Sequence, residues 1–299
     1  MNENIDNLLQ DYSIGNILMI EPINKGNTSN AIYILSDKGK WILRKLKNKN
    51  QGVSEYTISN ILANDSICPR IITTKSNEGY SYYAGNYYNL QEYIQSQPIN
   101  DDIETFEKLG KSLGILHNTL KIDIDLIEQE DRFSLENLWN QTKSKWKDVQ
   151  NYLNYFSFNI NNLESLIDEM ILCQNIKNVF IHGDLGKWNL IYNSEKIYVI
   201  DFGEVRKGDS HLDIAAALTS MVNFDLGKEF VCECLSVFYE TYVNYMKDFQ
   251  WDDLQRNIQL WTLRGILATL LYSNNEKTSI ERVRKMIDLK LSFDEIILI

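Results

Sequence analysis

The chain has 299 residues and a mass of 34.9 kDa, which is long enough for two domains with a sizeable core in each. Hydrophobic residues make up 44% and charged residues 24%, a globular balance that excludes a disordered chain, a collagen-like chain and a coiled-coil rod. The net charge of −11 argues against a general nucleic-acid-binding protein, because binding to phosphates requires a basic surface.

The N-terminal residues and the cysteines indicate the cellular compartment in which we expect the protein. Residues 1–6 are polar and acidic and lack the basic start and apolar run of a signal peptide. No apolar stretch approaches the ~18–20 residues that a transmembrane helix needs. Of the four cysteines, Cys232 and Cys234 would face different sides of a helix, and only three histidines are present, which argues against a Cys/His metal site. We therefore expect reduced thiols, a cytoplasmic protein and no membrane partner.

Residues 1–95 are predicted to form a β-rich domain. Two apolar runs flank the polar segment 36–40, which is the pattern of a β-hairpin. A helical stretch near 52–64 ends before Pro69. Strands are expected in runs rich in β-branched and aromatic residues, at 16–20, 31–35, 41–46, 70–74, 80–83 and 87–93.

Residues 96–299 are predicted to form a mostly helical domain, interrupted by a β-rich island at 179–201. Apolar residues recur at spacings of three and four between Phe106 and Leu120, which is one face of an amphipathic helix. Further helical patterns cover 134–156, 160–174, 212–222, 228–246, 251–272 and 279–289. The fold class is therefore α+β, with a β-rich N-terminal lobe and a mostly helical C-terminal lobe.

Charge is divided unequally between the two lobes. Residues 1–92 carry nine basic and nine acidic side chains, so the whole net charge of −11 falls on residues 93–299.

The β-rich island carries polar residues suited to phosphoryl transfer. Asp184 and Asn189 stand five positions apart in a loop between strands, and Asp201 follows the next strand, before Phe-Gly. Phosphoryl transfer needs a group that accepts the proton of the attacking hydroxyl, which Asp184 can provide. It also needs hard oxygen ligands for Mg²⁺, which Asn189 and Asp201 can provide. The alternative interpretation is a structural hairpin with an Asx turn at Asp184 and a polar cap at Asp201.

These motifs carry a resemblance to a known family. His-Gly-Asp at 182–184 with Asn189, followed by Asp-Phe-Gly at 201–203, resembles the catalytic loop and metal motif of the aminoglycoside phosphotransferase and choline kinase-like superfamily. Segments 208–215 and 109–117 are similar to two further parts of the family pattern. The resemblance implies a bilobal protein-kinase-like fold and a soluble enzyme that moves the γ-phosphoryl of ATP or GTP to a hydroxyl of a small molecule, with Mg²⁺.

The resemblance places the nucleotide in the N-terminal lobe. Asn27, Thr28 and Ser29 belong to a polar stretch where the family has its phosphate-covering loop, although this stretch contains a single glycine. Their backbone N–H groups or hydroxyls would meet phosphate oxygens. A plain polar hairpin turn is the alternative.

Further nucleotide-binding residues follow from the same resemblance. Arg44 matches the family position of the cation that meets the α- and β-phosphates. Strand alternation puts Lys45 on the opposite face, so only one of the two points into the cleft. Glu55, at the start of the next helix, matches the ion-pair partner of that cation. Gln91 and Tyr93 lie where the lobes join, and there the backbone would bind the adenine edge.

Other residues are expected to support the catalytic loop. By resemblance, His182 braces the loop without acting as a base, and Asp213 accepts hydrogen bonds from the loop backbone. His117 ends a core helix and is expected to be buried. The six tryptophans and 17 tyrosines are expected in the core and at interfaces, and none is assigned to the substrate.

The charge distribution favours a cationic acceptor, such as an aminoglycoside, because a cleft of one sign concentrates counter-ions. The acidic residues expected to line or rim it are Asp225, Glu229, Glu233, Asp252 and Asp253. A second interpretation is a catalytically silent nucleotide-binding or structural member of the superfamily, as among its spore-coat relatives, and a third is an interaction scaffold without nucleotide. The sequence leaves open the acceptor, the choice between ATP and GTP, and the oligomeric state.

Overall fold

The computed structural model describes residues 3–23, 31–121, 126–145, 160–174, 179–272 and 276–297. The chain divides into two compact units. Unit 1 comprises Met1–Ile99, Asp123–Gln129 and Asn189–Val205, and unit 2 comprises Asn100–Ile122, Glu130–Trp188 and Arg206–Ile299. This division differs from a single boundary near residue 95, because two later segments of the chain belong to unit 1.

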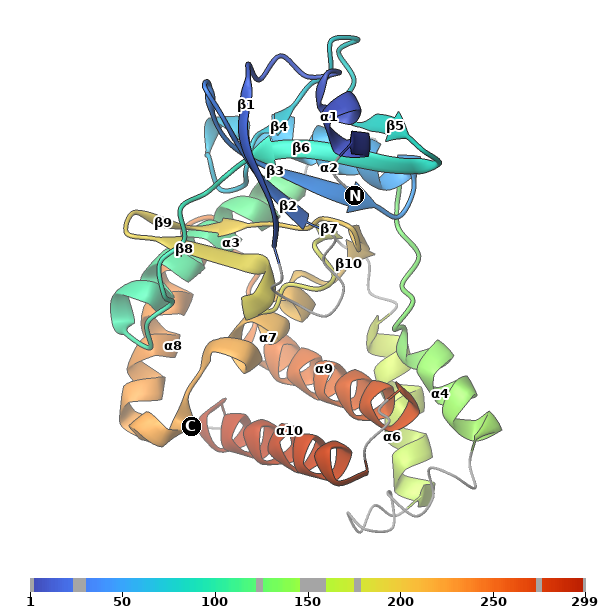
Figure 1. Cartoon of the computed structure of the whole chain (residues 1–299). Helices are drawn as coiled ribbons and strands as arrows, with labels where there is room; N and C mark the ends of the chain where they lie inside the picture. The colour runs from blue at the N-terminus through green and yellow to red at the C-terminus, as the bar shows by residue number, and fades with distance from the viewer. Residues whose placement is uncertain are drawn as a thin grey trace. The chain divides into compact units, whose positions relative to one another are not determined.

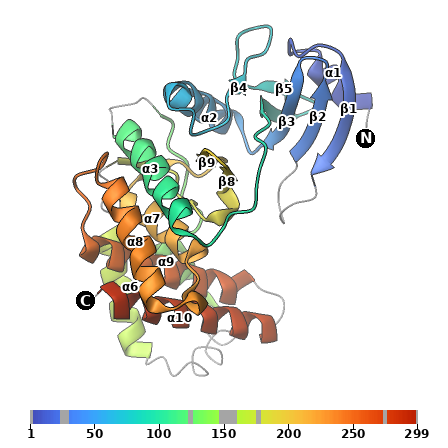
Figure 2. The same cartoon turned by 90° about the vertical axis from the view of Figure 1, so that its left-hand side faces the viewer.

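Unit 1 is built on a six-stranded antiparallel sheet. Its strands run in the order β1-β2-β3-β6-β4, and β5 pairs with β6. Strands β1, β2 and β3 are seen side by side in Figure 2. The predicted hairpin is present, with Ser36 opposite Gly39 across its turn. The elements are α1 (Glu3–Leu9), β1 (Ile17–Ile23), β2 (Ala31–Ser36), β3 (Gly39–Leu46), α2 (Lys49–Ile61), η1 (Leu62–Asn64), β4 (Ile71–Ile72), β5 (Ser81–Tyr83) and β6 (Asn86–Glu92).

Helix α1 is an element that the sequence pattern did not predict. Leu8 and Leu9 at its end are buried and pack in one cluster with Ile34 and Leu43 of the sheet. Burial of a leucine side chain stabilises a fold by roughly 1.5–3 kcal/mol. The short polar segment is therefore held as a helix by the sheet that it covers, and its own propensity contributes little.

A separate two-stranded hairpin in unit 1 comes from late in the chain. Strands β8 (Leu190–Asn193) and β9 (Lys196–Val199) pair antiparallel. The hairpin is tied to earlier parts of the unit by backbone hydrogen bonds from Gln97 N to Tyr192 O (2.8 Å) and from Val199 N to Ile67 O (2.7 Å). Because of these hydrogen bonds, the hairpin belongs to unit 1 together with the N-terminal residues.

Unit 2 is mostly helical. A buried hydrophobic cluster joins residues of α4, α6, β7, α7, α9 and α10, and α10 lies along α9 (Figure 1). A short two-stranded ladder pairs β10 with β7. The elements are α3 (Ile103–Leu120), α4 (Leu135–Ser144), α6 (Ile160–Gln174), β7 (Val179–Ile181), β10 (Arg206–Gly208), α7 (Ser210–Met221), η3 (Phe224–Leu226), α8 (Lys228–Tyr242), α9 (Trp251–Tyr272) and α10 (Glu276–Ile297).

The predicted fold class is confirmed, since a β-rich N-terminal unit accompanies a mostly helical one. Helices α6 and α9 begin and end where the apolar periodicity places them, and α10 is longer at both ends than predicted. The predicted helix 134–156 is present only in its first part, as α4, which ends at Ser144 with Lys145 as its C-cap, and the positions from 146 to 156 lie outside the described residues. In the part of the chain that the structure describes, none of the helices combines the length and apolar character that a membrane crossing requires.

Candidate active site

In unit 2, strand β7 leads directly into His182, Gly183 and Asp184. Asp213, in the first turn of α7, accepts hydrogen bonds from the backbone N–H groups of His182 (2.6 Å) and Gly183 (2.8 Å). The ring Nδ1 of His182 accepts one from the N–H of Asp184 at 3.3 Å. Gly183 has a φ of +83°, a left-handed conformation that favours glycine. Three successive N–H groups are thus anchored, and the side chain of Asp184 stays partly exposed.

Asp213 connects the loop to the helical core. Its Oδ2 lies 3.2 Å from Nε2 of His117, whose Nδ1 lies 2.9 Å from the hydroxyl of Tyr242. Burial raises the pKa of Asp213, but the hydrogen bond with His117, the charges of His117 and His182 and the N–H of Gly183 more than offset it. The net pKa of Asp213 is lowered, so the carboxylate that holds the loop is ionised at neutral pH.

We expect Asp213→Asn to lower the free energy of unfolding by about 3 kcal/mol at pH 7, because two backbone donors lose a buried anionic acceptor. The folded-state pKa of Asp213 lies below the unfolded value of about 3.9. The contribution of the carboxylate is therefore complete above that pH and is lost as the pH falls through the folded pKa. Urea unfolding of both proteins at pH 7 and pH 3 checks this, and the difference between them should be smaller at pH 3.

The exposed Asp168 of α6 provides the control, since Asp168→Asn should change stability little at either pH. An equal loss for both variants would contradict the anchoring role of Asp213.

A second network reaches the same loop. Both terminal nitrogens of Arg206 lie 3.4 Å from the carbonyl oxygen of Gly183. Asp131 joins Arg206 (3.1 Å) to Arg264 of α9 (3.0 Å), and Gln174 donates to the same carboxylate at 2.9 Å. These four residues were not predicted from the sequence, because they stand in segments far apart in the chain and none belongs to a local motif.

In unit 1, the β8–β9 hairpin brings Asn189 and Asp201 to one end of a ladder. Leu190 pairs with Val199, and the N–H of Ile200 donates to the carbonyl of Asn189 at 3.0 Å. Asp201 has a φ of +65°, a region that aspartate enters more readily than most residues. Asn189 and Asp201 therefore lie at the same end of the ladder, and an amide oxygen and a carboxylate are both ligand types that Mg²⁺ accepts.

Arg44 of β3 holds this edge to the sheet. Its guanidinium lies 3.2 Å from Glu55 Oε2 and 2.5 Å from Asp201 Oδ1. Burial alone would lower the pKa of Arg44, but the charges of Glu55 and Asp201 raise it above its ordinary value. Lys45, the other candidate, is exposed. The contacts of the predicted phosphate-binding cation therefore favour Arg44.

Glu55 of α2 is itself fixed from several sides. It is 3% exposed and accepts hydrogen bonds from Gln51 Nε2 (2.7 Å) and Asn89 Nδ2 (2.6 Å) besides Arg44. Gln51 also accepts from the N–H of Lys47, whose Nζ contacts Glu204 and donates to the carbonyl of Gly203 at 3.1 Å. Gln51, Asn89 and Lys47 were missed as well, although a polar residue one helical turn before Glu55 is a signal for such a partner.

The other predicted residues fall in different places. Asn27, Thr28 and Ser29 lie outside the described residues. Gln91 is buried in β6, and the N–H of Tyr93 donates to the carbonyl of Lys40 at 3.1 Å. The predicted acceptor-binding residues Asp225, Glu229 and Glu233 are exposed, the first on η3 and the others on α8, and Asp252 and Asp253 lie in the first turn of α9.

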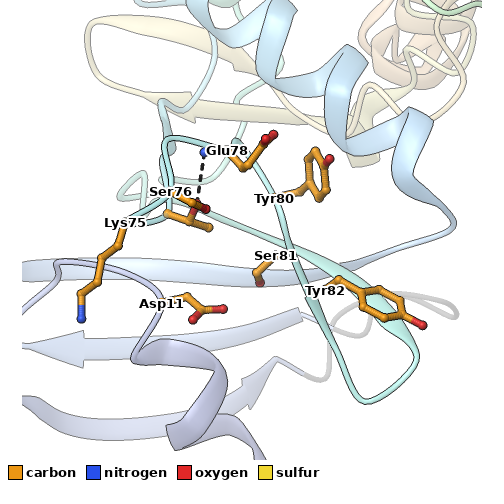
Figure 3. A pocket seen from close by; sticks show the side chains of 8 residues that line it. Asp11, Lys75, Ser76, Glu78, Tyr80, Ser81 and Tyr82 are labelled. Atoms are coloured by element: carbon orange, nitrogen blue, oxygen red, sulfur yellow. Dashed lines mark hydrogen bonds between the residues drawn. The ribbon is translucent and has the colours of Figure 1, made fainter.

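Unit 1 also contains a hollow of about 320 Å³ near β5 (Figure 3). Polar side chains line it, and no predicted site residue is among them: Asp11, Thr74, Lys75, Ser76, Glu78, Tyr80, Ser81 and Tyr82. Lys75 and the two carboxylates give it mixed charge, so its lining favours no one class of ligand.

The chain is similar to several known proteins. It is 24% identical over 204 residues to the protein LicA homolog of Metamycoplasma hominis, which covers 68% of this chain and 73% of that protein. Amicoumacin kinase, solved with AMP-PNP and Ca²⁺, shares 14% identity and a TM-score of 0.72 over 97% of this chain and 96% of that one. Choline kinase LicA from Streptococcus pneumoniae shares 15% identity and a TM-score of 0.62 over 98% and 99%.

These solved structures have the kinase-like fold that the sequence motifs predicted. A family model described as the phosphotransferase enzyme family matches residues 19–251, which is well over half of the chain and includes Asp184, Asn189 and Asp201. The predicted recognition is therefore confirmed, and the chain is a phosphotransferase that belongs to this enzyme family.

Proposed function

We propose that this enzyme transfers the γ-phosphoryl group of ATP or GTP to a hydroxyl of a small cationic molecule. The observation that carries the proposal is the anchored loop of Asp184, whose backbone N–H groups are bound by Asp213 and His182. A carboxylate on a rigid, partly exposed loop is suited to orient a hydroxyl and to take its proton as the phosphorus is attacked.

The hairpin edge in unit 1 is suited to a divalent cation. Asn189 and Asp201 supply oxygen donors, and Mg²⁺ takes few protein ligands, so the donor set fits the ion. Bound there, Mg²⁺ would neutralise charge on the β- and γ-phosphates. Arg44 is suited to bind phosphate oxygens with its planar guanidinium, and Glu55 keeps that guanidinium oriented. The AMP-PNP and Ca²⁺ named with amicoumacin kinase support a nucleotide and a divalent metal in this family.

The net charge supports a cationic acceptor. All of the −11 falls on residues 93–299, which include Asp184. Each surface contact between a carboxylate and an ammonium contributes on the order of 1 kcal/mol or less, so several would act together. The choline kinase among the solved structures is named for an acceptor with a quaternary ammonium, and an aminoglycoside is our first candidate here.

A phosphate-transfer screen against aminoglycosides, macrolides, choline, homoserine and methylthioribose tests the proposal. A thermal shift with Mg²⁺-nucleotide accompanies it. We expect a shift with nucleotide and turnover with at least one cationic acceptor. A shift without turnover on any acceptor would favour a catalytically silent member, and neither effect would favour a scaffold without nucleotide.

A cationic acceptor would bind in a salt-dependent way. Because exposed charges are screened at high ionic strength, the KM for the acceptor should rise several-fold between low salt and ~0.5 M salt. The KM for nucleotide should change less, since residues 1–92 carry no net charge. Steady-state kinetics with each substrate varied in turn measures both, and a salt-insensitive acceptor KM would contradict a cationic acceptor.

A further inference from the structure

Trp188 lies in the catalytic loop, four positions after Asp184, and 58% of its surface is exposed. The other tryptophans that the structure describes are buried or half-buried. Exposing an aromatic side chain of this size forgoes a large favourable burial term, so such a ring beside a catalytic carboxylate calls for an explanation.

The ring is held in a defined position. Its Nε1–H donates to Oδ2 of Asp184 at 3.3 Å. A Cβ atom on Gly186 would lie 2.3 Å from two of the ring carbons, so only glycine lets the indole lie this close to the loop backbone. The N–H of Lys187, the residue between Gly186 and Trp188, donates to Ser220 Oγ of α7 at 2.8 Å and so fixes this part of the loop. The indole is therefore docked on the loop at both its nitrogen and its six-membered ring.

This position determines what the ring can touch. An acceptor hydroxyl must come within about 3 Å of the Asp184 carboxylate to give up its proton. Since the indole N–H is hydrogen-bonded to one oxygen of that carboxylate, any such acceptor also lies beside the indole. The exposed part of the ring then forms a surface against which the rest of the acceptor rests.

The chemistry of that surface favours a positive group. The face of an indole carries negative charge density and attracts cations more strongly than other aromatic rings. Donation of its N–H to a carboxylate increases that density, because hydrogen bonds polarise the groups they join. The Asp184 carboxylate and the net charge of −11 on residues 93–299 also attract cations.

We propose that Trp188 determines acceptor specificity: its exposed indole forms one wall of the acceptor site and binds an ammonium group of the acceptor, while its N–H orients Asp184. This proposal rests on the proposed phosphoryl transfer to a hydroxyl at Asp184. The sequence motif alone assigns no such role, since Trp188 occupies a position between Asp184 and Asn189 that the motif does not specify.

Two substitutions separate the ring from its N–H. Trp188→Leu removes both and should raise the KM for a cationic acceptor by roughly 2- to 30-fold, the range of a cation–π contact. Trp188→Phe keeps an aromatic face and loses the N–H, so it should lower kcat by about 10-fold with a smaller change in that KM. The KM for nucleotide should stay unchanged in both. Leu226→Ala, at an exposed apolar residue of the same unit, is the control and should change neither constant.

A fluorescence measurement tests whether the Trp188 indole binds an ammonium group, and it does not require turnover. Acrylamide quenching of the wild type and of Trp188→Phe gives the component from Trp188 by difference. We expect tetramethylammonium chloride to protect this component more than sodium chloride of equal concentration, and more than neopentyl alcohol, an uncharged molecule of similar size. Equal protection by neopentyl alcohol, or none by tetramethylammonium, would overturn the ammonium assignment.

The two proposals fail in distinguishable ways. If a neutral acceptor is phosphorylated and Trp188→Leu leaves its KM unchanged, the role of Trp188 is wrong and the phosphoryl transfer stands. If no acceptor in the screen is phosphorylated while tetramethylammonium still protects Trp188, the ring binds cations as proposed and the proposed reaction is wrong.

Discussion

Replacing Asp184 with asparagine is expected to lower kcat by about 10²- to 10⁴-fold, the range of general-base catalysis. An amide has the size of the carboxylate and retains an oxygen that can accept from Trp188 Nε1, so the loop should keep its conformation. An amide does not take up a proton at neutral pH, and the acceptor hydroxyl would lose its base. Steady-state kinetics with the acceptor from the screen measures the effect.

Nucleotide binding separates this role from a structural one. Asp184 is expected to contact the acceptor, so the dissociation constant of Mg²⁺-nucleotide should stay nearly unchanged in Asp184→Asn. Asp248→Asn, at an exposed aspartate that pairs with Lys121, is the matched control and should retain full activity. Turnover near that of the wild type in Asp184→Asn would contradict the catalytic assignment.

Asp201→Ala is expected to abolish turnover and to weaken Mg²⁺-nucleotide binding, because it removes a charged ligand of the metal. It also removes one of the two carboxylates that pair with Arg44, so that only the ion pair with Glu55 is left of the two. Asn189→Ala should act in the same direction but less, since a neutral amide oxygen is lost. Nucleotide titrations at several Mg²⁺ concentrations measure both variants.

The matched control for the metal edge is Glu195→Ala, at the exposed turn of the same hairpin. It removes a carboxylate from the far end of the β8–β9 ladder and should leave nucleotide affinity unchanged. If Asp201→Ala bound nucleotide at saturating Mg²⁺ as well as Glu195→Ala does, the metal role of Asp201 would be wrong.

The sequence predicts best what depends on neighbouring residues. Helices α6 and α9 were found with their ends because apolar periodicity is a local signal. Strand β10 was missed because Arg-Lys-Gly has no strand pattern, and its pairing with β7 is what makes it a strand. Helix α1 was missed for the same reason, since its burial depends on the sheet.

The residues of the candidate site also differ in whether the sequence alone indicates them. Asp184, Asn189 and Asp201 belong to short motifs whose residue types follow from phosphoryl transfer chemistry, so the sequence indicates them. Asp131 and Arg264 stand in segments without a motif, and only the tertiary structure joins them to the loop through Arg206. Residues that belong to a short motif were therefore predicted even where their partners are distant in the chain, as for Asp213, and residues outside a motif were not.

The ladder between β8 and β9 bears on how related chains can be aligned. Asn189 and Asp201 meet because Leu190 pairs with Val199 and Ile200 bonds to Asn189, whatever the length of chain beyond those pairs. Residues added in equal number to both strands, or inserted in the turn after Asn193, lengthen the hairpin away from this edge. The number of residues between the two proposed ligands is therefore free to vary among homologues, and a search pattern with a fixed gap would miss chains that keep the same geometry.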